Sequence, residues 1–148
     1  MSVKFYPSNS RLVRFIGYLW AGPNSLIGLT VGLIGLCTGG KVAAHRGCLE
    51  FHGGFVKWAL DTVAGGAMAM TLGHTILGQS DRGLAFVRDH EQVHVRQYER
   101  WGPAFLPAYL LSSGYLWLRG RDMYRENPFE AEAFALSDPS KIRRTKRT

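Results

Sequence analysis

The pattern of apolar and polar positions along the chain changes near Ser80. Before this residue, short apolar stretches alternate with polar residues and are separated by glycines, whereas apolar positions after it recur every three or four residues. Alternation is typical of strands, and a spacing of three or four is typical of helices. The pattern therefore predicts an α+β fold, with a small antiparallel sheet in the first half and helices in the second half.

Two stretches of the first half are predicted to form the sheet. Residues 41–60 are expected to be β structure, because "CLEFH" alternates apolar and polar residues between glycines that suit turns. Residues 64–79 are expected to supply one or two further strands. Their core, "MTLGHTILG", is rich in apolar and β-branched residues and has glycine where the chain must turn.

The second half is predicted to form three helices. The first begins at Ser80 or Asp81, either of which can act as its N-cap, and ends at Gly102 before a proline. The second covers residues 103–118, "PAFLPAYLLSSGYLWL", which are mostly apolar and carry no charge. The third begins near Pro128, after a polar loop, and contains "FEAEAFAL".

A separate apolar run, residues 15–37, contains no charged side chain. It is long enough to cross a bilayer as one helix, but Pro23 and Asn24 interrupt it and favour a shorter, buried helix. We therefore expect a buried segment. The alternatives are a membrane-inserted or interfacial segment and, last, a secretory signal, since no clear cleavage site follows the run.

The string "HEQVH" lies within the first predicted helix and has the spacing of a zinc site. Positions four apart share a helical face, so His90 and His94 can direct imidazole nitrogens to one metal ion. Glu91 is turned away from both, and its carboxylate can act as the general base on a metal-activated water. Catalytic zinc has three protein ligands, so a third is required. Glu130 and Glu132, on the third predicted helix, are candidates for it.

"HEQVH", followed downstream by "NPFEAEA", resembles the HExxH and E-x-x-A motifs of the gluzincin zinc metallopeptidases. The resemblance implies a zincin-like helical half that binds one Zn²⁺, with His90, His94 and Glu130 as the ligands and Glu91 as the base. It also implies hydrolysis of a peptide or protein substrate. The wider strings "HVRQYERWG" and "YRENPFEAEAF" resemble a group of short, uncharacterised bacterial proteins.

One position departs from the gluzincin pattern. Phe134 stands where many of these peptidases carry an aspartate that supports a ligand histidine. This difference leaves a second interpretation open, in which the domain binds zinc without catalysis and serves as a structural or interaction module, with a membrane as one surface on which it can act.

Several further residues are candidates for assisting roles. His74, in a predicted strand, can face the metal and polarise an oxyanion, or it can be a structural histidine. Gln97 shares the helical face of the two ligand histidines and can bond a ligand or the substrate. The candidate hydrogen-bond donors to a transition state are Tyr109, Tyr115 and Tyr124.

The net charge of +7 is concentrated at the end of the 148-residue chain. The last eight residues, "KIRRTKRT", hold five of the 18 lysines and arginines and no acidic residue, which leaves +2 for residues 1–140. We predict a polar segment 1–14, a single domain 15–140 and a disordered basic tail 141–148. The near-neutral body argues against a nucleic-acid partner, whereas the tail and the apolar run 15–37 can contact an acidic membrane surface.

The two cysteines, Cys37 and Cys48, form neither a CxxC pair nor a disulfide framework. Thiols of this kind suit a reducing compartment, and small apolar positions in the fold. We therefore expect a cytoplasmic location, with membrane association as an addition if residues 15–37 contact a bilayer.

Overall fold

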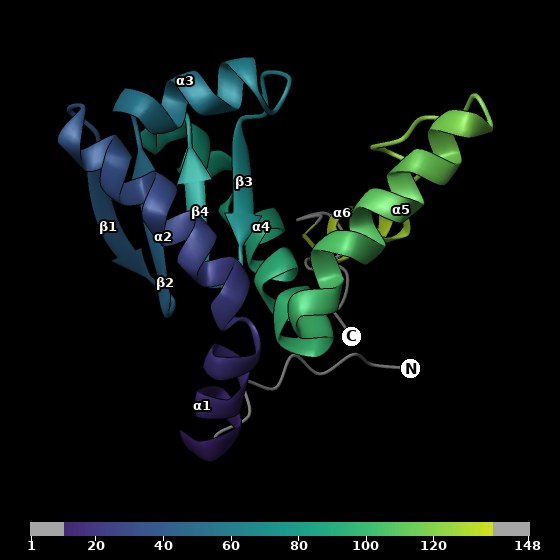
Figure 1. Ribbon diagram of the computed structural model, residues 1–148, viewed down its shortest axis with the longest axis horizontal. Helices are drawn as coiled ribbons and strands as arrows, with labels where there is room; N and C mark the ends of the chain where they lie inside the picture. The colour runs from purple at the N-terminus through teal and green to yellow at the C-terminus, as the bar shows by residue number, and fades with distance from the viewer. Residues whose placement is uncertain (1–10, 138–148) are drawn as a thin grey trace, which may run out of the picture.

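The computed structural model describes residues 11–137 and confirms the α+β fold class (Figure 1). The predicted basic tail and the first ten residues lie outside the described part. In chain order the elements are α1 (Arg11–Trp20), α2 (Gly22–Cys37), β1 (Lys41–His45), β2 (Cys48–His52), α3 (Gly54–Thr62), β3 (Ala69–Leu72), β4 (Thr75–Gly78), α4 (Asp81–Trp101), the 3₁₀ turn η1 (Gly102–Ala104), α5 (Phe105–Leu118) and α6 (Pro128–Ser137).

The four strands form one mixed sheet in the order β1-β2-β4-β3. The hairpins β1–β2 and β3–β4 are antiparallel as expected, but β2 and β4 are parallel, with Leu49 opposite Thr75. The parallel pair arises because β4 turns back from β3 and enters the sheet between β3 and β2. Its direction depends on this long-range insertion, which alternation along the sequence does not reveal.

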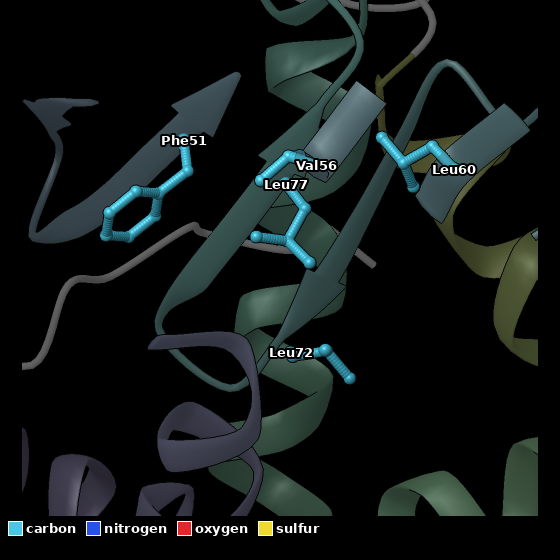
Figure 2. Packing of buried hydrophobic residues seen from close by; sticks show 5 residues of the cluster. All are labelled: Phe51, Val56, Leu60, Leu72 and Leu77. Atoms are coloured by element: carbon cyan, nitrogen blue, oxygen red, sulfur yellow. The ribbon is translucent and has the colours of Figure 1, made fainter. Parts of the chain in front are cut away.

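The expectation of β structure for residues 41–60 is right for β1 and β2 and wrong from Gly54 onward, where α3 begins. Val56 and Leu60, four residues apart, are buried, which is the spacing of a helix. Figure 2 shows these two side chains with Phe51 of β2, Leu77 of β4 and Leu72 of β3, all members of one hydrophobic core. α3 therefore covers this end of the sheet.

Helix α2 approaches the same face of the sheet closely through glycines, and partly buried leucine and valine side chains of the helix pack beside them. A Cβ atom at Gly32 would lie 2.5 Å from the ring of Phe51, and one at Gly28 would lie 2.8 Å from the side chain of Thr75. Only glycine permits this close approach. The opposite face of the sheet carries Cys48 and Ile76, which pack on α4, so the sheet lies between α2 in front and α4 behind (Figure 1).

The apolar run 15–37 is divided between two helices. α1 and α2 meet at an angle of 69°, and α1 already begins at Arg11, within the segment predicted to be polar. Among residues 11–137 no single helix has the length and apolar character needed to cross a membrane, whereas α1 and α2 meet that requirement only when taken together as a bent pair.

The helical half is built around α4. Ser80 caps it as predicted, since its Oγ accepts a hydrogen bond of 3.1 Å from the Gly83 amide, and Gly102 ends it with a φ of 56°. α6 packs along α4. A second hydrophobic core, which includes Tyr98 and Phe129, joins these two helices to the start of α5.

Candidate metal centre

Two histidines of α4 face each other across one helical turn. His90 Nε2 and His94 Nε2 are 3.2 Å apart, and both rings are largely buried. The uninterrupted helix from its Ser80 cap sets this separation, because residues four apart project from the same face. The sequence expectation that these imidazoles converge on one point is therefore confirmed.

Glu130 of α6 completes the group. Its Oε2 lies 3.0 Å from His90 Nε2, and its Oε1 lies 3.4 Å from His94 Nε2. Asn127 fixes the start of α6, because its Oδ1 accepts a hydrogen bond from the Phe129 amide and its Nδ2 donates to the Tyr109 carbonyl. Asn127 is fully buried, as expected of a cap that holds one helix against another.

The separations within the His90–His94–Glu130 group match those around a small tetrahedral cation. Ligands about 2.0 to 2.1 Å from zinc are about 3.4 Å apart at tetrahedral angles. One atom from each residue of this group lies within 4.8 Å of the others, and all three residues are deeply placed. Two imidazoles and one carboxylate are also the donor set of many catalytic zinc sites. The group can therefore hold a metal ion with the side chains as they stand.

Gln97 orients His94. Its Oε1 lies 2.8 Å from His94 Nδ1, and an amide oxygen only accepts, so Nδ1 carries the proton and Nε2 offers its lone pair to the group. The Gln97 Nε2 donates to the Phe129 carbonyl at 2.9 Å and to Glu132 Oε2 at 2.8 Å. Gln97 thus links α4 to α6. It also hydrogen-bonds one carboxylate oxygen of Glu132, and the other oxygen of that carboxylate pairs with Arg100. Within the described residues, Glu130 and not Glu132 joins the two histidines.

His90 has a different environment. Its Nδ1 is buried and has no hydrogen-bond partner among the described residues. The ring of Phe134 lies 4.6 Å from the His90 ring, measured between centroids. Phe134 thus packs beside this ligand, at the position where the gluzincin pattern has an aspartate. On its Nδ1 side His90 is held by packing, whereas the Nδ1 side of His94 is held by a hydrogen bond.

The Glu91 carboxylate lies beside the group and is almost fully buried. Thr71 of β3 donates a hydrogen bond of 2.6 Å to Glu91 Oε2. Burial raises the pKa of Glu91, while the neighbouring histidines and the Thr71 hydroxyl oppose that rise. Glu91 is therefore a carboxylate with increased basicity in a fixed orientation, as general-base catalysis requires.

The charges in the group favour an ionised Glu130 carboxylate beside either a protonated histidine or a metal ion. Burial opposes the charge on Glu130, but hydrogen bonds from His90, His94 and Tyr109 lower its pKa to about 2. Burial also opposes the charge on His94, yet its contact with Glu130 raises its pKa above the ordinary value. Glu130 thus stays ionised at neutral pH, which is the form that binds a cation.

The group opens into a cavity of about 550 Å³ between β3, α4 and α5. Glu91, His90 and His94 line it, together with Tyr109 and Tyr124. Most of the remaining wall is apolar, from the alanines and methionines before and within β3 and from the leucines of α5. The Tyr109 hydroxyl donates to Glu130 Oε1 at 2.7 Å.

Two other sequence candidates lie elsewhere. His74 is not among the residues that line this cavity; its Nε2 lies 2.9 Å from Glu99 Oε1, and its ring stacks on Tyr18 with centroids 4.0 Å apart. The Tyr115 side chain is exposed and accepts hydrogen bonds from Arg119. In contrast, Thr71 contacts Glu91 although its sequence environment gave no indication of such a role.

Comparisons with protein-family models, with curated proteins and with solved structures found no match to the chain. The resemblance to gluzincins therefore depends on the motif residues themselves and on how the structure arranges them.

Proposed function

We propose that the protein is a zinc-dependent hydrolase, most simply a metallopeptidase, with His90, His94 and Glu130 as the zinc ligands. The observation that carries the proposal is the convergence of the two Nε2 atoms, 3.2 Å apart, on the Glu130 carboxylate, whose Oε2 lies 3.0 Å from His90 and whose Oε1 lies 3.4 Å from His94, at the wall of a cavity that also contains Glu91. Ion pairs that serve only structure do not need two histidines and a carboxylate to meet beside a cavity.

A bound zinc ion would lower the pKa of a water molecule to about 7 and polarise a substrate carbonyl. Glu91 accepts the proton of that water as its oxygen forms a bond to the carbonyl carbon. Glu91 then gives the proton to the amide nitrogen as the carbon–nitrogen bond breaks, so that an amine leaves and a carboxylic acid remains, which loses its own proton to solvent at neutral pH. The hydrogen bond from Thr71 keeps the Glu91 carboxylate in one orientation through both transfers.

Tyr109 and Tyr124 line the cavity together with Tyr98, and we assign the stabilisation of the developing oxyanion to either Tyr109 or Tyr124. No role in this chemistry is assigned to His74. The apolar wall favours a peptide or protein substrate with an apolar side chain next to the cleaved bond. We place the protein in the cytoplasm, since both cysteines are free thiols.

A second function, zinc binding without catalysis, is favoured by one observation. His90 Nδ1 has no acceptor in the described structure, and Phe134 packs where an acceptor is expected. An acceptor at this position would fix a proton on His90 Nδ1 and raise the basicity of Nε2, and a catalytic metal ligand is tuned in this way. In this alternative the site stabilises the contact between α4 and α6, and the protein serves as an interaction module.

The test compares hydrolysis of a peptide library by zinc-loaded wild type, Glu91→Gln and Asp89→Asn. Asp89 is a matched control, because it is a carboxylate of the same helix that is exposed and pairs with Arg46. We expect the wild type and Asp89→Asn to cleave peptides, and Glu91→Gln to retain zinc and lose cleavage by at least a hundredfold. Zinc retention without cleavage in all three proteins would favour the interaction module.

A further inference from the structure

Helix α2 carries large apolar side chains on the face that is turned away from the protein body. Gly28 and Gly32 face the sheet, Gly35 faces α3, and all three are buried. Leu26 and Leu33, by contrast, point away from the protein body and are 65% and 51% exposed. A helix on the surface of a globular protein normally turns its large apolar side chains inward. An apolar outer face over a glycine inner face is typical of a helix that contacts lipid.

Helix α1 is amphipathic, with a basic edge. Leu12, Ile16 and Leu19 lie on one stripe of this helix, and each is more than half exposed. Arg11 and Arg14 lie on the neighbouring stripe and are exposed as well. Basic side chains beside an apolar stripe are the pattern of helices that lie in the plane of a membrane interface.

The aromatic residues near the bend between these helices fit the same environment. Trp20 is half exposed, yet its indole covers Gly102, where any Cβ would lie 2.3 Å from the ring. Tyr18 donates a hydrogen bond of 2.6 Å to the Gly47 carbonyl and stacks on His74. These contacts fix α1 to the body, so its exposed stripe is presented by a supported helix. Tryptophan and tyrosine are enriched at the boundary between lipid and water.

The positive charge of the N-terminal part of the chain indicates which kind of partner the exposed apolar face of α1 and α2 contacts. The first 49 residues contain five lysines and arginines and no aspartate or glutamate. Lys41, which directly follows the turn after α2, is exposed on β1. A second copy of the chain placed against the same face would bring the arginines of two α1 helices together, which like-charge repulsion disfavours. Anionic lipid headgroups instead attract each basic residue.

We propose that the outer face of α1 and α2, defined by Leu12, Ile16, Leu19, Leu26, Ile27 and Leu33, docks on a lipid bilayer that carries anionic headgroups. The apolar side chains enter the boundary between headgroups and acyl chains, and Arg11 and Arg14 contact the headgroups. The protein lies on the bilayer and does not need to cross it. This inference is independent of the hydrolase proposal, because it uses none of the residues of the metal centre.

The test measures co-flotation of the full-length protein with vesicles of phosphatidylcholine alone and with vesicles that also contain phosphatidylserine. We expect binding to the mixed vesicles that weakens as salt is added. Replacing both arginines, in Arg11→Gln/Arg14→Gln, is expected to weaken this binding about fivefold per arginine. Ile27→Asp is expected to weaken it at least tenfold, since a carboxylate resists transfer into the interface.

Phe86→Asp is the matched control, because Phe86 is 83% exposed on α4, outside the outer face of α1 and α2. This variant is expected to bind like the wild type. Circular dichroism verifies folding of each variant, and Leu26→Ser provides a milder substitution on the same face if Ile27→Asp does not fold. Failure of the wild type to bind either vesicle, or equal loss in Phe86→Asp, would overturn the proposal. So would a dimer in solution that Ile27→Asp dissociates, because the occupant would then be a second copy.

Discussion

The role of Gln97 can be tested by Gln97→Met, which keeps the length of the side chain and removes its amide. In the wild type this amide accepts from His94 Nδ1 at 2.8 Å and donates to the Phe129 carbonyl at 2.9 Å, in a position with no exposed surface. The variant would leave these two buried groups without a partner. Each such group costs about 1 to 3 kcal/mol, so the free energy of unfolding should fall by about 2 to 6 kcal/mol.

The same substitution should weaken metal binding. His94 would lose the acceptor that fixes its proton on Nδ1, and loss of such a partner typically reduces metal affinity about 10- to 100-fold. Zinc affinity is measured by competition with a chromophoric chelator, and the free energy of unfolding by urea denaturation of the metal-free protein. The two measurements separate orientation of the ligand from stability of the fold.

Gln92→Met is the matched control for this experiment. Gln92 is also a buried amide of α4, but within residues 11–137 its side chain makes one weak hydrogen bond, of 3.7 Å to Cys48 Sγ. We expect its zinc affinity to stay within about twofold of the wild type, because Gln92 does not touch a ligand. If Gln97→Met bound zinc as tightly as Gln92→Met, packing alone would orient His94, and the reasoning would be refuted.

Three further experiments test the site and the fold. Glu130→Ala should reduce zinc affinity far more than Glu132→Ala, measured by the same competition assay, and the reverse order would move the third ligand to Glu132. Thr71→Val should retain zinc and reduce kcat by about tenfold through loss of the hydrogen bond that orients the general base; an unchanged kcat would contradict that role. Gly32→Ala should lower the free energy of unfolding by about 1 to 2 kcal/mol, because its methyl group would overpack against the ring of Phe51. Gly22→Ala, with open space around its Cβ position, should not lower it. Equal urea midpoints for the two variants would show that the ring can move aside.

Local spacing was sufficient to predict part of the metal centre. The convergence of His90 and His94 follows from the period of a helix, and so does the placement of Gln97 on their face. The choice of Glu130 over Glu132 came only from the resemblance to gluzincins. In the structure, Gln97 and Arg100 hydrogen-bond the Glu132 carboxylate and leave Glu130 as the glutamate that meets the histidines.

Contacts between distant segments could not be predicted in this way. Thr71 reaches Glu91 only because β3 packs against α4, and nothing in "MTLG" distinguishes its threonine from one that faces solvent. The parallel pairing of β2 with β4 likewise depends on the order of strands in the sheet. Helix α3 was missed because it is only nine residues long, and its two buried positions are too few to establish a period.

The central claim is that one zinc ion binds between α4 and α6. Its most direct test is the metal content of the protein purified without chelator, measured by elemental mass spectrometry beside His94→Ala. We predict one zinc per chain in the wild type and none in the variant, since two remaining ligands hold zinc weakly. A wild type without metal, or a variant that retains zinc in full, would contradict the account.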